Sequence, residues 1–242
     1  NITGVESGNR SVRLSYTDGK TEERMVSVTG NGTAYASFSY QKPVPRDENM
    51  IYVEGGTFSM GSASGDEKPV HSVTVSGFVM AKTEVTQKEF RDLMGFNPSY
   101  FKGDNLPVET VTWYDAVAFC NAKSRKNGLK EVYTISGIWK TSRGNITAAN
   151  VTVDWSASGY RLPTEAEWEW AARGGKSSRG YTYAGGNSEG SVAWYDGNSG
   201  GKTQAVGTKV ANELGLYDLS GNVYELCWDW YGSYSSESET DP

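Results

Sequence analysis

Apolar and polar residues alternate along the first part of the chain, a pattern with a period of two that predicts β-strands. The expected strands are residues 12–16, 25–28 and 34–40. Asp18-Gly19 follows the first of them as a turn signal. We therefore expect residues 1–46 to form a small N-terminal β appendage that ends in a stiff, proline-containing linker.

Helical periodicity begins only after residue 85, and each predicted helix carries its own start signal. Three threonines are each followed, three residues later, by an acidic residue, which is the pattern of a capping box. The threonines are Thr86, Thr112 and Thr164, and their partners are Glu89, Asp115 and Glu167. The pattern predicts three amphipathic helices, which begin after these threonines.

The strands expected in the main part of the chain are short. Residues 50–53 predict the first strand and residues 70–79 predict a single longer one. Residues 132–135 and 151–153 predict a hairpin between the second and third helices. After Gly175 the chain is rich in Gly, Ser, Tyr and Asn as far as about residue 212, which predicts irregular structure held by turns.

Composition limits the possible functions. The 242 residues suffice for one large domain with a small attachment. A formal charge of −6 argues against a nucleic-acid partner and against binding to an anionic membrane surface. No stretch approaches the roughly 18 apolar residues of a membrane-spanning segment. Two cysteines exclude a disulfide-dense fold, and the one histidine, His71, excludes a site built from several histidines.

The segment 215–231 combines turn glycines, two carboxylates and two tryptophans, so we expect a buried turn that polar ligands stiffen. Asp218 and Glu225 need water, a cation or a hydrogen-bond donor in such a place. The residues alone leave two interpretations open. The carboxylates either hold a cation, or they bond to backbone amides and an arginine such as Arg161.

Several ordered motifs resemble those of a known family. They are GGTFSMGS at 55–62, KTEVT at 82–86, PVETVTW at 107–113, YRLPTEAEWE at 160–169 and GLYDLSGNV at 215–223. Together they look like the formylglycine-generating-enzyme, or sulfatase-modifying-factor, domain. The resemblance implies an α+β fold of the C-type lectin-like kind over residues 47–242, with few helices and much irregular structure. The final strands of the family fold have no counterpart in this sequence, so we expect that the C-terminal end of the domain is either missing from the chain or replaced by something else.

The resemblance implies two opposed functions. The enzymes of the family use a copper-binding cysteine pair to oxidise a substrate cysteine to formylglycine, and neither Cys120 nor Cys227 matches a position of that pair. We therefore expect no copper in this chain and a non-catalytic binding protein, because some proteins on this scaffold are variable products of diversity-generating retroelements. The alternative is a copper-dependent oxidase whose catalytic C-terminal segment is absent from this chain.

The resemblance also implies a calcium site, built from the side chains of Asp218 and Glu225 and the carbonyls of Gly221 and Val223. For ligand binding we single out Trp230, Tyr231 and Tyr234, because Tyr, Ser and Gly together are typical of ligand-reading loops; a solvated linker is the alternative. We expect a monomer that binds a protein or glycan. We also expect it to be exported, by a leader that is not part of this chain, to the extracellular space or the cell surface.

Overall fold

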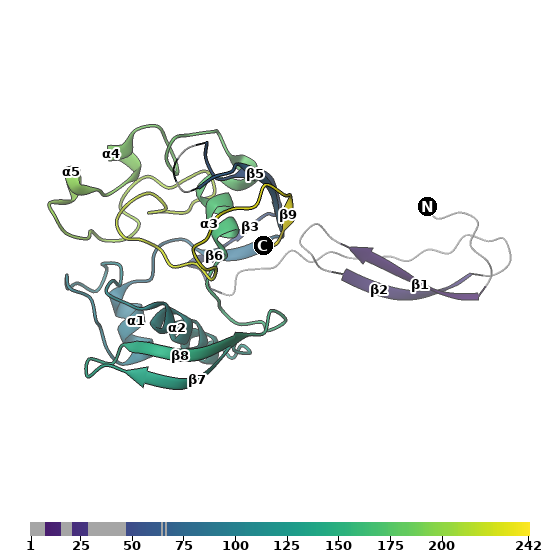
Figure 1. The fold of residues 1–242 in the computed structure, drawn as a ribbon, viewed down its shortest axis with the longest axis horizontal. Helices are drawn as coiled ribbons and strands as arrows, with labels where there is room; N and C mark the ends of the chain where they lie inside the picture. Colours follow the sequence, from purple (N-terminus) through teal and green to yellow (C-terminus); the bar gives the residue numbers. More distant parts are fainter. Residues whose placement is uncertain (1–7, 16–20, 29–46, 64, 66) are drawn as a thin grey trace.

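The computed structural model describes residues 8–15, 21–28, 47–63, 65 and 67–242. Strands β1 (Gly8–Ser15) and β2 (Thr21–Val28) form an antiparallel hairpin, which lies apart from the other elements in Figure 1. This hairpin confirms the first two strands predicted for the N-terminal segment. The third predicted strand, the Asp18-Gly19 turn and most of the linker lie outside the described residues.

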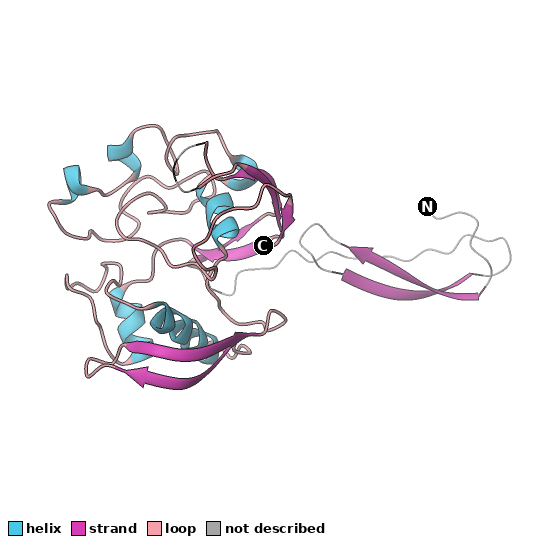
Figure 2. Cartoon of the chain, in the orientation of Figure 1, coloured by secondary structure: helices cyan, strands magenta, loops and turns pink. Residues whose placement is uncertain are grey.

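Short sheets and a few helices make up the main part of the chain, and loops connect them (Figure 2). Strand β3 (Met50–Val53) pairs antiparallel with β6 (Phe78–Ala81), and β4 (Gly56–Met60) pairs antiparallel with β5 (His71–Val75). Strand β9 (Glu239–Thr240) adds to β5 in parallel, so the end of the chain joins a sheet formed near residue 60. This is the α+β architecture that the resemblance implies.

The prediction of one strand over residues 70–79 is wrong, because β5 and β6 belong to different sheets. The break falls at Ser76-Gly77. A Cβ at Gly77 would lie 2.1 Å from the Tyr52 hydroxyl, so the backbone passes too close to β3 for any side chain. Asp241 fixes the break from the other side, since its carboxylate accepts hydrogen bonds from the Ser76 amide at 2.6 Å and the Ser76 hydroxyl at 2.7 Å.

The three predicted helices are present as α1 (Gln87–Met94), α2 (Trp113–Lys126) and α3 (Glu165–Ala172). Each begins after its predicted threonine cap. The capping box is complete in α2 and α3, whereas at α1 only the threonine half forms. The carboxylate of Glu89 instead makes a 2.8 Å ion pair with Lys123 of α2, which ties the first two helices together.

The predicted hairpin between α2 and α3 is longer than expected, as β7 (Tyr133–Lys140) and β8 (Ile146–Val153). Register shifts near Trp139 and a left-handed Gly137 allow the strands to continue past the last alternating residues. Between α3 and residue 212 the chain forms only η1 (Gly175–Ser177), α4 (Glu189–Val192), α5 (Asp196–Ser199) and loops, which confirms the expected irregular structure. Among the described residues, no helix is long and apolar enough to cross a bilayer.

Two buried clusters hold the segment that follows residue 215. Leu216, which is fully buried, packs with β3, β5 and Trp170 of α3 in the first cluster. Trp228 packs against the second cluster, which includes Leu162, and its ring stacks 5.1 Å from that of Tyr133. The turn between Leu216 and Trp228 is thus anchored in a core at each end.

Candidate functional site

The backbone of the turn at residues 218–225 is unusually constrained. Asp218, Gly221 and Asn222 all have left-handed φ values, of 60°, 94° and 58°. For the two residues with side chains, this conformation costs on the order of 1–2 kcal/mol each. Hydrogen bonds hold it, since Asp218 Oδ2 accepts the Gly207 amide at 2.6 Å and the Asn222 amide donates to the Trp194 carbonyl at 2.8 Å.

The Asn222 side chain connects three segments of the chain. Its Oδ1 accepts the Gln204 amide at 3.0 Å, and its Nδ2 donates to the Gln204 carbonyl at 3.2 Å. The same Nδ2 donates to Glu84 Oε2 at 2.7 Å, and Glu84 Oε1 accepts the Val223 amide at 3.2 Å. Glu84, which precedes α1, therefore lies against the centre of the turn.

Three carboxylates gather at this turn. Burial raises the pKa of Glu84 to about 9, and the negative charges of Asp218 and Glu225 add to the shift. Burial also raises the pKa of Asp218, which the Gly207 amide opposes. Within the described part of the chain, none of the three carboxylates forms an ion pair. The turn therefore gathers three acidic groups without a positive partner in the described part of the chain.

Glu225 is exposed as a residue, yet protein surrounds its carboxylate on the wall of a cavity. This desolvation raises the pKa of Glu225 to about 7, and Asp218 adds to the shift. The Trp168 indole N–H faces the carboxylate and opposes the shift, at a geometry short of a regular hydrogen bond. The cavity measures about 670 Å³ and is lined by β6, α2, Tyr217, Leu219 and residues 223–226, with Glu84 also in its wall.

Arg161, which we considered as a partner for these carboxylates, has a different one. Its guanidinium makes two hydrogen bonds of 2.6 Å to the carboxylate of Glu167, so the pair is bidentate. The alternative interpretation of the turn is therefore half right: Asp218 does bond a backbone amide, but the arginine is engaged at the start of α3.

The donors at the turn fit a hard cation. Calcium prefers several oxygen ligands from carboxylates and backbone carbonyls, and Asp218, Glu225 and the carbonyls of Gly221 and Val223 are of this kind. In the described ranges, no three His, Cys, Asp or Glu side chains are placed to hold a metal by themselves, so the carbonyls would have to contribute. Sequence reasoning missed Glu84 as a site residue, although it lies in one of the family motifs.

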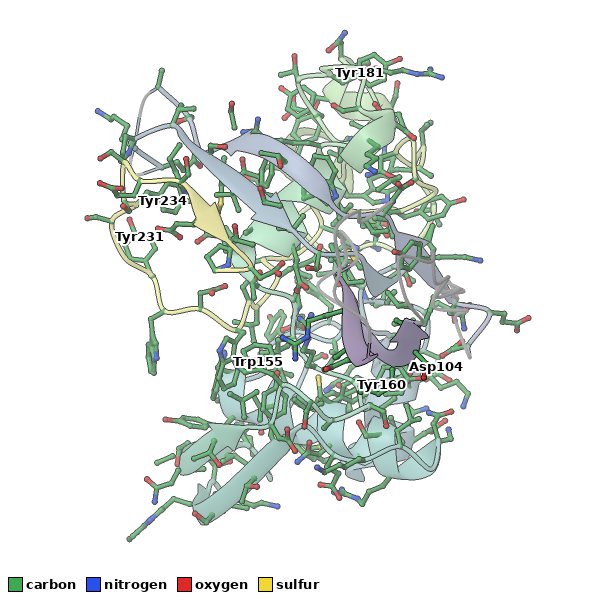
Figure 3. All side chains as sticks on the ribbon, turned by 90° about the vertical axis from the view of Figure 1, so that its right-hand side faces the viewer. Asp104, Trp155, Tyr160, Tyr181, Tyr231 and Tyr234 are labelled. Atoms are coloured by element: carbon green, nitrogen blue, oxygen red, sulfur yellow. The ribbon has the colours of Figure 1, made fainter. Side chains whose placement is uncertain are left out.

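The residues singled out for ligand binding differ in exposure. Trp230 is 90% exposed and Tyr231 is 84% exposed. Tyr234 is half-buried: its hydroxyl donates to Glu165 Oε1 at 2.8 Å and its ring lies 5.0 Å from that of His71. In Figure 3, Tyr231 and Tyr234 lie along the C-terminal segment at one edge of the molecule. The first two side chains are available to a ligand, whereas Tyr234 attaches the segment to the core.

An aromatic cluster supports Trp230. Its ring stacks on Trp113 with centroids 6.4 Å apart, and Trp113 is fixed in turn by a 3.0 Å hydrogen bond from Nε1 to the Cys227 carbonyl. Trp113 also packs 5.3 Å from Trp228, whose far side meets the half-exposed Trp155 at 5.7 Å. The exposed indole of Trp230 therefore rests on an ordered support.

The two cysteines are both free thiols. Cys120 is buried on α2, as predicted, and Cys227 is half-buried. Burial raises the pKa of each thiol to about 12, so both are protonated at neutral pH. A thiolate is the form that binds metals and attacks electrophiles, so neither position favours copper binding or redox chemistry.

Comparison with known families agrees with this architecture. Residues 36–240 match the sulfatase-modifying factor enzyme 1-like domain, which is most of the chain. The protein belongs to this family, and its fold is the C-type lectin-like fold of formylglycine-generating enzymes.

Three relatives show the range of the family. The chain is 45% identical over 215 residues to the chaperone protein LppX of Paenibacillus barcinonensis, covering 80% of this chain and 75% of that protein. It is 27% identical to the inactive C-alpha-formylglycine-generating enzyme 2 of Bos taurus, covering 80% and 73%. The solved structure of Treponema denticola variable protein 1 superposes with a TM-score of 0.69 at 36% identity, covering 79% of this chain and 77% of that one.

Proposed function

We propose that this protein is a non-catalytic ligand-binding module that displays its C-terminal segment as a binding surface. The observation that carries the proposal is the similarity to a variable protein at 36% identity. The exposed Trp230 and Tyr231 on an ordered aromatic support agree with it, because rigid aromatic side chains supply contact area at a low entropic cost. By this proposal the protein is a monomer, outside the cell or at its surface, whose C-terminal surface is diversified by a retroelement.

We also propose that the turn at residues 218–225 binds calcium as a structural ion. The carboxylates of Asp218 and Glu225 and the carbonyls of Gly221 and Val223 would hold it. The three acidic groups without a positive partner and the strain of the turn backbone support this, since a divalent cation would stabilise the ionised carboxylates and hold the turn in place. EDTA should then lower the melting temperature and added calcium should restore it. An unchanged melting curve in EDTA would count against the ion.

The binding surface can be tested with a glycan microarray and an immobilised protein panel, each probed with the labelled full chain. We expect selective retention that Trp230→Ala weakens at least tenfold. Trp139→Ala is the matched control, because Trp139 is 73% exposed but lies on β7, away from the C-terminal segment. Equal loss in both variants, or no selective retention on either panel, would contradict the proposed surface.

The oxidase alternative makes a different prediction. An enzyme of this kind would convert the cysteine of a sulfatase-motif peptide to formylglycine when copper is supplied. We expect no conversion by this chain, because both of its thiols are protonated at neutral pH. Mass spectrometry of the peptide would detect the aldehyde, and its formation would refute the non-catalytic proposal.

Chaperone activity is a second candidate, suggested by the name of the Paenibacillus relative. The observation that favours it is the number of exposed apolar side chains close in sequence within residues 224–231, namely Tyr224, Leu226, Trp230 and Tyr231. A holding activity would suppress the aggregation of a heated client such as citrate synthase at a stoichiometric ratio. Suppression without selectivity on either panel would favour this candidate over selective ligand binding.

A further inference from the structure

Glu84 brings a third carboxyl group into the centre of the turn without being one of its expected ligands. It lies between β6 and α1, and only 9% of the residue is exposed. A buried carboxylate is costly unless its oxygens are bonded, so its contacts identify its role.

Protein donors occupy both Glu84 oxygens. Oε2 accepts the side-chain amide of Asn222 at 2.7 Å, and Oε1 accepts the main-chain amide of Val223 at 3.2 Å. The Val223 N–H belongs to the peptide group that joins Asn222 to Val223. Glu84 therefore fixes the side chain of Asn222 and the peptide plane that follows it.

This peptide group has a particular place in the turn, because it lies between the two carbonyls that would hold calcium. The carbonyl of Gly221 precedes Asn222, and that of Val223 follows it. Asn222 also has a left-handed φ of 58°, which a non-glycine residue keeps only when its surroundings hold it. The Trp194 carbonyl and residue Gln204 supply the remaining contacts.

We propose that Glu84 is a positioning residue for the calcium site: through Asn222 and the Val223 amide it sets the direction of the two carbonyl ligands. The claim rests on the calcium binding proposed above. In this role Glu84 contacts the residues of the turn and not the ion, since direct coordination would compete with the two amide hydrogen bonds that its oxygens already accept. Mutating a residue that orients metal ligands in this way typically weakens metal affinity by about 10–100-fold.

The test measures binding of the metal itself to the full chain. Calcium affinity is obtained by titration calorimetry, and terbium affinity by luminescence sensitised through Trp168, which faces Glu225. The variants are Glu84→Gln, Glu84→Ala and Asn222→Gly. Glu169→Gln is the matched control, because Glu169 also accepts a buried backbone amide, that of Gly61 at 3.0 Å, but does not contact the turn.

We expect Asn222→Gly to bind calcium about tenfold more weakly, although it keeps every carboxylate and tolerates the left-handed φ. Glu84→Gln and Glu84→Ala lose the same charge, but glutamine still accepts one of the two amides. Their affinities should therefore fall in the order wild type, glutamine, alanine, while the control binds as the wild type does. Melting in EDTA verifies that each variant is folded.

Three results would overturn the proposal. If Asn222→Gly binds like the wild type while Glu84→Gln is weakened, Glu84 acts through its charge or as a direct ligand. Equal affinities of Glu84→Gln and Glu84→Ala would lead to the same conclusion, and they decide the matter even if Asn222→Gly does not fold. If the wild type binds neither calcium nor terbium, the calcium proposal itself is refuted. This outcome differs from the first two, because weak binding by the variants alone leaves the calcium proposal intact.

Discussion

The pKa of Glu84 predicts how the metal-free protein responds to pH. The folded chain holds the Glu84 proton up to a pKa of about 9, whereas the ordinary value is 4.5. Between these values the unfolded chain binds one proton fewer than the folded chain. The contribution of Glu84 to the free energy of unfolding is therefore highest below pH 4.5 and falls as pH rises through this window.

One proton is worth about 1.4 kcal/mol per pH unit, so the ceiling between pH 6 and pH 8 is about 2.7 kcal/mol. The proton is coupled to Asp218 and Glu225, which spreads part of the effect over the group. Glu84→Gln has no such proton and should lack this part of the pH dependence. We expect the stability of the variant relative to the wild type to increase by about 2 kcal/mol from pH 6 to pH 8.

Urea unfolding in EDTA, followed by tryptophan fluorescence and circular dichroism at pH 6, 7 and 8, measures this difference. Titrations of groups that are not coupled to Glu84 are common to both proteins and cancel. A difference between variant and wild type that stays constant within about 0.5 kcal/mol would refute the reasoning, because it would mean that Glu84 ionises normally in the folded chain. Between pH 6 and pH 8, glutamine at position 84 should thus gain stability relative to the wild type in the metal-free protein, while it weakens calcium binding.

Three further predictions concern the fold. Asp115→Ala should lower the free energy of unfolding, measured in urea, by about 3 kcal/mol, because the fully buried carboxylate accepts three hydrogen bonds, including one from the Ile146 amide at 2.8 Å. A loss below about 1 kcal/mol would contradict its role in joining α2 to β8. Gly221→Ala should lower the free energy of unfolding by at least about 2 kcal/mol, since φ is 94° and the new Cβ would lie 2.3 Å from the Trp194 carbonyl oxygen. A melting temperature equal to that of the wild type would exclude this strain. The Cys120 thiol should react with Ellman's reagent only after unfolding, and rapid labelling of both thiols in the native protein would show that Cys120 is not buried.

Local signals predicted the helices well, because the information that starts a helix lies within four residues. The threonine caps at Thr112 and Thr164 need only the acidic residue three positions later, and both capping boxes form. Glu89 shows the limit of this reasoning. Its local partner was the backbone at Thr86, but an ion pair with Lys123 of α2 replaces that contact. Burying the Lys123 ammonium without a counter-charge would cost more free energy than leaving the start of α1 without its second capping bond.

Long-range contacts explain what the sequence left undetermined. The break between β5 and β6 at Ser76-Gly77 follows from the approach of Tyr52 and from Asp241, which is 165 residues away in the chain. A strand pattern that is apolar on both sides of the break cannot show that its two halves pair with different neighbours. From the sequence, Arg161 could similarly pair with the carboxylates of the turn or with Glu167. Only the folded chain shows that its partner is Glu167.

The candidate site combines both situations. The turn residues Asp218 and Glu225 lie close in sequence, so composition and family resemblance could single them out together. Glu84 lies 138 residues before its partner Asn222, and its nearest sequence signal is the start of α1. A residue that orients a ligand through a backbone amide leaves no local pattern, because the amide is present at every position except proline. The ligands of such a site can therefore be predicted from a short motif, whereas the contacts that set its geometry have to be found in the folded chain.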